Sequence, residues 1–262
     1  MNYKISSKAN STVKYAKKLL TSSSFRKKEK LFLLEGIRLC DEALKSGIKF
    51  NTVFFTEKIE KKFPKTINSL IEKSRTFFET TEEVIALISD TDTPQGVVCI
   101  CEMTSAKDID RKYSNKLIMI ENIQNPSNLG SIFRTCDALG IKDVIISGDS
   151  CDIYNPKVLR GSMGAAFRLN IKVCDNFRGF VSELISSGYK VYATVPSSDA
   201  EILGKNSLFS KKCAVIFGNE GNGVTPEIID LCTKKLTIPM IKNAESLNVS
   251  VAAGIIIWEL TR

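Results

Sequence analysis

The sequence predicts an α/β protein with two domains, a small α/β domain followed by a larger domain built on a parallel sheet. The 262 residues are 43% hydrophobic and 25% charged, which are ordinary values for a globular chain and exclude disordered and fibrous classes. Short apolar runs alternate with amphipathic segments, a pattern typical of a parallel sheet with helices on both faces. A polar stretch at residues 106–116 divides the chain and is expected to be a linker.

The segment 1–30 holds the whole excess of positive charge. It contains nine lysines and arginines and one glutamate, which equals the net charge of +8 for the whole chain. Ser11 is expected to cap a helix that continues to Leu20, with apolar residues on one side and lysines on the other. This basic face is either an ordinary solvated surface or a contact for a polyanion.

The first domain is expected over residues 31–105. Apolar runs that end at charged or turn residues predict its strands, and amphipathic stretches that end at small residues predict its helices. The predicted strands are 30–35, 52–56 and 95–102, and the predicted helices are 36–46, 67–74 and 81–89.

The second domain is expected over residues 117–262, where strands and helices alternate. Its last helix is apolar on every side, which predicts burial in a core or at a subunit interface. The predicted strands are 117–121, 143–147, 190–194, 213–217 and 235–238, and the predicted helices are 129–139, 156–164, 177–187 and 247–260.

The composition excludes several kinds of chemistry. The chain has no histidine, which removes Ser-His-Asp and Cys-His catalysis and histidine-ligated metal sites. Its eight cysteines never form a C-x-x-C pair, so no metal site is expected. Cys99 and Cys101 share one face of a predicted strand and are either a redox pair or ordinary thiols of a reduced cytosol. No stretch of 18 apolar residues is present, so the protein is expected to be cytoplasmic and to have no membrane contact.

Three segments rich in Gly, Asn and Ser follow predicted strands, where ligands bind in parallel α/β folds. In the first, 121–140, Arg134 stands among apolar residues of a helix that begins near Asn128. Such an arginine either extends to the solvent or is directed at a phosphate or carboxylate. In the last, 238–254, Ser246 opens the final helix.

The middle segment, 216–226, contains Gly218, Gly221 and Gly223. Glycines let the backbone approach a ligand closely and present its N–H groups. Their order is G-x-x-G-x-G, which is not the dinucleotide-binding fingerprint, and no G-K-[ST] follows. A glycine-rich turn that is capped by Thr225 is the alternative interpretation.

Together the segments NPSNLGSIFRTCDALG, KVLRGSMGAAFRL, FGNEGNGV and IPM…SLNVSVAAGI resemble the SpoU (TrmH) family of RNA 2′-O-ribose methyltransferases, in the SPOUT superfamily. The resemblance covers residues 117–262, and residues 30–100 look like the L30e-type RNA-binding domain of many members. One departure is Asn125, where the family commonly has aspartate before the proline. This position is expected to be structural rather than catalytic.

The resemblance implies a Rossmann-like domain with a trefoil knot, a homodimer, and S-adenosylmethionine as the methyl donor. It implies RNA as the substrate, with 23S ribosomal RNA favoured over tRNA, and leaves a catalytically silent RNA-binding assembly factor as a further alternative. It places the donor against Thr194, Gly218, Asn219, Gly223, Ile238, Met240, Ser246 and Leu247.

The resemblance makes Arg134 the key catalytic residue, with Asn128, Glu220, Ser246 and Asn248 around the ribose. The family proposal gives Arg134 the role of base, but a guanidinium stays protonated in proteins. We therefore expect Arg134 to hold a phosphate, while a phosphate oxygen or Glu220 receives the proton. The residues expected to bind RNA are Lys14, Lys17, Lys18, Arg26, Lys27, Lys28 and Arg160.

Overall fold

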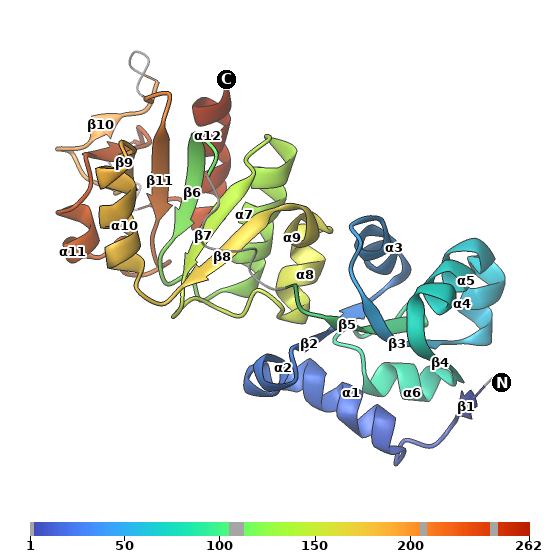
Figure 1. The fold of residues 1–262 in the computed structure, drawn as a ribbon. Coiled ribbons are helices and arrows are strands. Elements are labelled where there is room, and N and C mark those ends of the chain that lie inside the picture. The colour runs from blue at the N-terminus through green and yellow to red at the C-terminus, as the bar shows by residue number, and fades with distance from the viewer. Residues whose placement is uncertain (1–2, 105–112, 205–208, 242–245) are drawn as a thin grey trace. The chain divides into compact units, whose positions relative to one another are not determined.

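A computed structural model describes residues 3–104, 113–204, 209–241 and 246–262 (Figure 1). The chain divides into two compact units. The first unit contains residues 1–105 together with 152–167, and the second contains 106–151 and 168–262. The segment 152–167, which contains Arg160, therefore belongs to the first unit, although the residues directly before and after it belong to the second.

The first unit is built on a five-stranded sheet of order β1-β4-β3-β5-β2, in which β5 is antiparallel to both neighbours. Successive residues of its strands point to opposite faces, and both faces are covered. Phe32 packs on one face with α3, α4, α5 and α8, while Leu33 packs on the other with α1 and α6. The elements are β1 (Tyr3–Ile5), α1 (Ser11–Thr21), α2 (Ser23–Glu29), β2 (Leu31–Glu35), α3 (Ile37–Lys45), β3 (Phe50–Phe55), α4 (Glu57–Lys62), α5 (Pro64–Lys73), β4 (Ser74–Thr80), α6 (Glu82–Leu87), β5 (Val97–Glu102) and α8 (Pro156–Ser162).

The basic segment at the start is part of this first unit. Val13, Ala16 and Leu19 of α1 are fully buried in the core on one face of the sheet. The helix is capped by Asn10, whose side chain accepts the Thr12 N–H at 2.8 Å, and not by Ser11 as expected. The structure thus differs from the expected boundary at residue 30, because α1 supplies apolar surface that the sheet buries.

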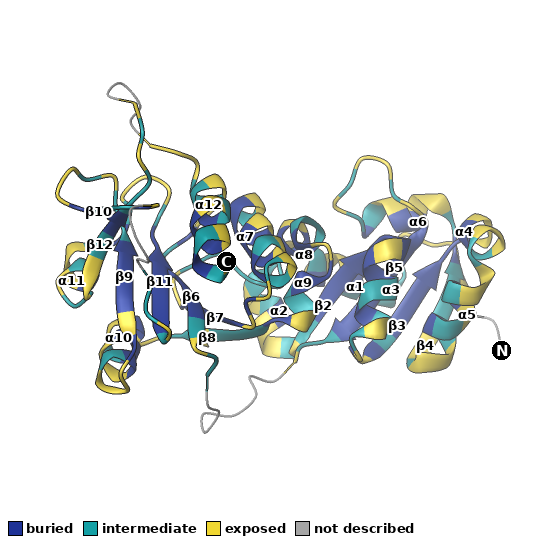
Figure 2. Ribbon diagram, turned by 90° about the horizontal axis from the view of Figure 1, so that it is seen from above, coloured by how far each residue is buried: buried dark blue, intermediate teal, exposed yellow. Residues whose placement is uncertain are grey.

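The second unit is built on a seven-stranded sheet of order β10-β12-β9-β11-β6-β7-β8, and every strand pair among its described residues is parallel. Its central strands β6, β7, β9 and β11 are mostly dark in Figure 2, since both faces of the sheet are covered there, and its helices are exposed on their outer sides. The elements are β6 (Lys116–Ile120), α7 (Pro126–Ala138), β7 (Asp143–Ser147), α9 (Ala165–Arg168, which starts in the first unit), β8 (Asn170–Cys174), α10 (Phe177–Ser186), β9 (Lys190–Thr194), β10 (Glu201–Ile202), β11 (Cys213–Phe217), α11 (Pro226–Ile229), β12 (Lys234–Thr237) and α12 (Val249–Thr261).

The last helix, α12, is buried on one side only. Ala253, Ile256, Ile257 and Leu260 face the interior, and the helix packs beside α7. On its outer side Val251, Ile255 and Trp258 are 50%, 39% and 56% exposed. We call these three residues the α12 stripe. Within the described chain, no helix is long and apolar enough to cross a membrane.

Candidate cofactor-binding and catalytic site

The segments that follow β9, β11 and β12 enclose a cavity of about 520 Å³ in the second unit. Because parallel strands end at the same edge of a sheet, loops distant in sequence meet there. All eight residues that the resemblance assigned to the donor line this cavity, namely Thr194, Gly218, Asn219, Gly223, Ile238, Met240, Ser246 and Leu247.

The glycine-rich loop after β11 closes into a tight turn. Asn219 and Gly223 exchange two backbone hydrogen bonds of 2.9 Å, and the Asn219 side chain accepts the Gly221 N–H and donates to the Asn122 carbonyl. A Cβ at Gly218 would lie 2.0 Å from the Gly223 carbonyl carbon, so no side chain fits there. At Gly223 the space is open, but a φ of +70° favours glycine. Position 218 is therefore glycine because the backbone of the same loop passes close to it, and position 223 is glycine because of its backbone conformation.

The lining of the cavity fits S-adenosylmethionine. Apolar surface from Ile238, Met240 and Leu247 and polar atoms of Thr194 and Ser246 line it, a combination that suits a ligand with a flat ring and polar ends. The volume lies within the roughly 300–1,000 Å³ typical of small-molecule sites. In the described residues, no three Asp, Glu, Cys or His side chains gather as they would around a metal ion.

Three of the predicted catalytic residues form one chain of hydrogen bonds beside the cavity. Asn248 Nδ2 donates to Asn128 Oδ1, and Asn128 Nδ2 donates to Glu220 Oε1, both at 3.0 Å. Asn248 also caps α12 through its Oδ1, which accepts the Ser250 N–H. These hydrogen bonds therefore connect the segments after β6, β11 and β12, and fix them relative to one another.

The carboxylate of Glu220 is held as an anion. Burial on its own raises the pKa, but hydrogen bonds from Asn128 and from the backbone N–H groups of Asn125 and Gln124 outweigh it and lower the pKa below its usual value. Since a lower pKa makes a weaker base, Glu220 is better suited to holding the loop that follows β6 than to accepting a proton.

Asn125 and Glu121 have structural roles in the loop between β6 and α7. The Asn125 side chain accepts the Ser127 N–H at 2.9 Å and caps α7, a task that aspartate performs equally well. Glu121 is buried and accepts the N–H and hydroxyl of Thr225 at 3.0 and 2.7 Å. Sequence reasoning assigned no role to Glu121, although a carboxylate directly after a buried strand was the available signal.

Arg134 lies apart from this cluster. It is exposed on α7 and does not line the cavity. Among the described residues it has no hydrogen-bond or ion-pair partner, so the partner expected for its charge is not within the described chain. The structure thus brings together Asn128, Glu220, Ser246 and Asn248, and leaves Arg134 free on the outer face of its helix.

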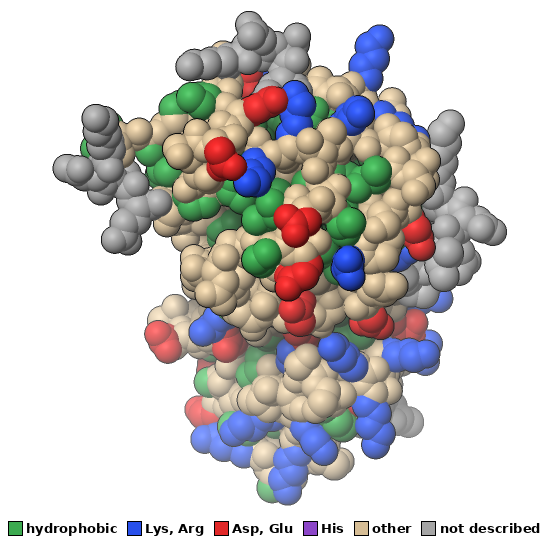
Figure 3. Space-filling model, turned by 90° about the vertical axis from the view of Figure 1, so that its left-hand side faces the viewer, with side chains coloured by type: hydrophobic (Ala, Val, Ile, Leu, Met, Phe, Trp, Pro, Cys, Tyr) green, Lys and Arg blue, Asp and Glu red, His purple; other side chains and the backbone are tan. Residues whose placement is uncertain are grey.

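The lysines expected to bind RNA remain exposed on α1 and α2. Figure 3 shows lysine and arginine side chains gathered on the first unit, in the lower part of the view. The exposed residues of the expected set are Lys14, Lys17, Lys18, Lys27 and Lys28.

The assignment of Arg26 to RNA contact is wrong. Its side chain is only 3% exposed, and Nε and Nη2 donate to Asp152 Oδ2 at 2.8 and 2.6 Å, while Nη1 donates to the carbonyls of Leu19 and Leu20. Arg160 is likewise engaged, with Nη2 2.6 Å from Asp90 Oδ2 and Nη1 3.8 Å from Glu35 Oε2. Both arginines therefore hold residues 152–167 on the first unit.

Replacing Arg26 with methionine should destabilise the first unit by about 3–5 kcal/mol, because it leaves a buried carboxylate and two carbonyls without their donor. Urea unfolding followed by circular dichroism measures the change. Lys27→Met, at an exposed neighbouring position, should change the free energy by less than ~0.5 kcal/mol. Equal effects of the two substitutions would contradict the structural role of Arg26.

Cys99 and Cys101 lie with Cys40 in the core of the first unit, on one face of the sheet as expected. Burial raises the pKa of both Cys99 and Cys101 well above the usual thiol value. Since the thiolate is the reactive form, these residues act as apolar core groups.

Two family profiles match the chain. The SpoU rRNA Methylase family matches residues 115–258, and the MRM3-like substrate binding domain matches residues 10–99. The match of the second profile includes most of the basic segment, in agreement with the packing of α1.

Relatives extend over both units. A 23S rRNA (guanosine(2553)-2′-O)-methyltransferase, RlmP of Bacillus subtilis, is 35% identical over 98% of each chain. The crystal structure of an AdoMet-bound rRNA methyltransferase from Sinorhizobium meliloti superposes with a TM-score of 0.86 at 28% identity, covering 98% of this chain and 96% of that one. A tRNA (guanosine(18)-2′-O)-methyltransferase of Aquifex aeolicus is 32% identical but covers 59% of this chain and 72% of its own. The chain belongs to the SpoU rRNA methylase family.

Proposed function

We propose that this protein transfers a methyl group from S-adenosylmethionine to a ribose 2′-hydroxyl of 23S ribosomal RNA in the cytoplasm. The observation that carries the proposal is the cavity of the second unit, in which the donor residues and the Asn248–Asn128–Glu220 chain meet. The relative with 98% coverage supports ribosomal RNA, since the tRNA-modifying relative matches only 59% of the chain.

In this proposal the donor supplies a sulfonium-activated methyl group, so the chain must position the hydroxyl and provide for one proton. The residues that line the cavity hold the donor, and the loop after β11 shapes its wall through Gly218 and Asn219. The Asn248–Asn128–Glu220 chain keeps the three segments in register. Because three hydrogen bonds from the loop after β6 already occupy the oxygens of Glu220, the proposal passes the proton, as the methyl–oxygen bond forms, to an RNA phosphate oxygen beside the hydroxyl.

Arg134 acts on the RNA phosphate in this proposal. Its guanidinium is exposed and has no hydrogen-bond or ion-pair partner among the described residues, which suits a planar two-pronged grip on a phosphate. Since Arg134 does not line the cavity of its own subunit, we infer that it serves the site of a partner subunit. The trefoil knot implied by the family is part of the same proposal.

Labelled donor and a 23S rRNA transcript test the function directly. The purified protein should transfer the label to the transcript, and nucleoside analysis should find it in one 2′-O-methylated nucleoside. Label in a methylated base, or no transfer to ribosomal RNA together with transfer to tRNA, would contradict the proposal.

The proposed homodimer uses the α12 stripe. Val251, Ile255 and Trp258 are spaced along one side of a helix, and exposed apolar side chains in such a row favour a protein contact. We expect Trp258→Glu to convert the dimer to a monomer in analytical ultracentrifugation. Val173→Glu, at another exposed apolar position of the second unit (48% exposed), should leave the dimer intact, and a dimer that survives Trp258→Glu would place the interface elsewhere.

The exposed lysines of α1 and α2 should set RNA affinity and its salt dependence. Replacing Lys14, Lys17 and Lys18 with glutamine should lower the slope of log K against log salt by roughly 0.7–0.9 for each phosphate that is no longer neutralised. The single-turnover rate at saturating RNA should change little. Truncating residues 1–30 is a poorer test, because it removes Val13, Ala16 and Leu19 from the core. An unchanged slope would make this basic face an ordinary solvated surface.

A further inference from the structure

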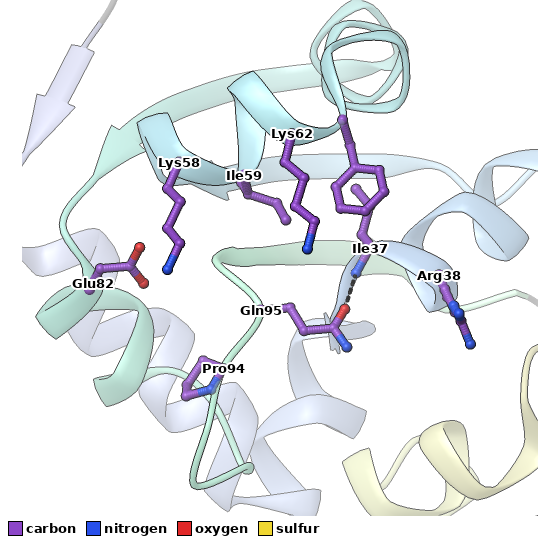
Figure 4. A pocket seen from close by; sticks show the side chains of 9 residues that line it. Ile37, Arg38, Lys58, Ile59, Lys62, Glu82, Pro94 and Gln95 are labelled. Atoms are coloured by element: carbon purple, nitrogen blue, oxygen red, sulfur yellow. Dashed lines mark hydrogen bonds between the residues drawn. The ribbon is translucent and has the colours of Figure 1, made fainter.

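A second cavity, of about 550 Å³, lies in the first unit at the edge of the sheet where β2 and β3 end and β5 begins (Figure 4). We call it the edge cavity. Apolar surface comes from Ile59, Phe63 and Pro94. Positive charge comes from Arg38 on α3 and from Lys58 and Lys62 on α4. Figure 4 shows both lysines extending from α4 toward the loop that carries Pro94 and Gln95, with Glu82 across from Lys58.

The cations of the edge cavity differ from others on the same helices. Lys61 pairs with Glu57 on α4, and Lys45 pairs with Asp41 at 2.7 Å on α3. Within the described residues, by contrast, no carboxylate lies within ion-pair distance of Arg38, Lys58 or Lys62. Three such cations against one carboxylate, Glu82, leave a net charge of 3 − 1 = +2 around the concave surface, which attracts an anion.

The loop that faces these cations is held firmly. Gln95 Oε1 accepts the Ile37 N–H at 3.1 Å, which fixes the amide at the mouth of the cavity (Figure 4). Gly96 has a φ of +91°, and a Cβ there would lie 2.7 Å from Thr56 Oγ1, so the loop passes close to the start of α4. The Gln95 amide nitrogen has no partner among the described residues and remains a donor.

The same loop is anchored from behind. The buried carboxylate of Glu35 accepts the Asp90 N–H at 2.8 Å and the Thr91 hydroxyl. Arg160 of α8 then pairs with Asp90 at 2.6 Å. The loop side of the cavity is therefore preorganised, and the exposed cations opposite it are the groups that need ordering when a ligand binds.

We propose that the edge cavity binds one unpaired nucleotide of the RNA substrate. The phosphates contact Arg38, Lys58 and Lys62, the base packs on Phe63 and Pro94, and the Gln95 amide donates to the base edge. Cations beside an aromatic ring and a fixed polar group are the features that recognise single-stranded RNA. This inference rests on the proposed function, since it takes the substrate to be RNA, but it concerns a surface that methyl transfer itself does not use.

Binding of a short, unstructured, fluorescein-labelled oligoribonucleotide to the full-length protein tests the proposal. Fluorescence anisotropy should show about tenfold weaker binding for the double variant Lys58→Gln/Lys62→Gln, with a salt slope lower by about 1.4, because two phosphates of a single strand are no longer neutralised. Lys61→Gln, on the same helix but already paired with Glu57, should bind as the wild type does. Phe63→Leu should weaken binding about fivefold or more by removing the stacking surface.

The outcomes for the variants, for AMP and for methyl transfer distinguish this proposal from a free-nucleotide site and from failure of the proposed function. Wild-type affinity in the double variant, or in Phe63→Leu, would overturn the placement of the nucleotide. Saturable binding of AMP without binding of the oligoribonucleotide would assign the cavity to a free nucleotide and would overturn it too. Methyl transfer to 23S rRNA is measured on the same wild-type preparation. Absence of transfer overturns the proposed function, whereas transfer by a protein whose cavity variants bind normally overturns only this inference.

Discussion

Replacing Arg134 with alanine is expected to slow single-turnover methylation of a 23S rRNA fragment by about 100-fold or more. The proposed contact aligns the 2′-hydroxyl with the methyl group, and misplacement of reacting atoms by about 1 Å can cost about 100-fold in rate. Donor binding should survive, because Arg134 does not line the donor cavity. Rates are measured at saturating RNA, alongside donor affinity by calorimetry.

A lysine at this position provides the matched comparison. Arg134→Lys keeps the charge but loses the planar pair of donors, so it should recover little of the rate. Ser131→Ala, at another exposed position on the same helix, should stay close to wild type. An alanine variant within about threefold of the wild-type rate would remove Arg134 from the mechanism.

Gly218→Ala is expected to weaken S-adenosylmethionine binding by up to about 100-fold. The added Cβ would stand 2.0 Å from the Gly223 carbonyl carbon, so the wall of the cavity must move, and overpacking of this kind costs roughly 1–3 kcal/mol. Calorimetric titration with the donor measures the effect, and circular dichroism checks that the protein remains folded.

The neighbouring glycine serves as the control. A Cβ at Gly221 would meet only Asn219 Oδ1, at 3.6 Å, which is ordinary contact. Gly221 also lines the cavity, but its added Cβ leaves the wall in place, so Gly221→Ala should weaken donor binding clearly less than Gly218→Ala does. Normal affinity in Gly218→Ala would show that the donor binds outside this loop.

The strands at the centre of the second sheet were predictable because they are uninterrupted apolar runs. Asp143–Ser147, Lys190–Thr194 and Cys213–Phe217 have the predicted bounds. Strands with a different pattern were missed. In β4, Arg75 and Glu79 interrupt the apolar run, and β8 lies at the edge of its sheet with half-buried residues. Such strands depend on pairing with neighbours, which local sequence does not encode.

The convergence of the three loops was predictable to a greater extent than the surroundings of the basic residues. Loops after parallel strands meet at one edge, so the motifs converge as the resemblance implied. Arg26, however, looks like its lysine neighbours in sequence, and its partner Asp152 is 126 positions away. Arg160 likewise pairs with Asp90 and Glu35, which are also distant in the sequence. A charge that pairs within the fold and one that faces the solvent cannot be separated without the tertiary structure.

The apolar pattern of the last helix was informative in part. It predicted burial in a core or at a subunit interface without distinguishing the sides of the helix. Ile256 and Ile257 lie in the core, whereas no described part of the chain covers the α12 stripe, in which Trp258 is 56% exposed. A helix that is apolar on every side can satisfy one side in its own core and the other in an oligomer. Local sequence does not distinguish these two sides, because both carry the same residue types.

The measurement that tests the central claim most directly is a map of 2′-O-methylated nucleotides in 23S rRNA and tRNA from cells with and without the gene. We expect one methylated position of 23S rRNA to disappear when the gene is deleted, to return with the wild-type gene, and not to return with Arg134→Ala. Unchanged 23S rRNA methylation, together with the loss of a methylated tRNA position, would contradict the account.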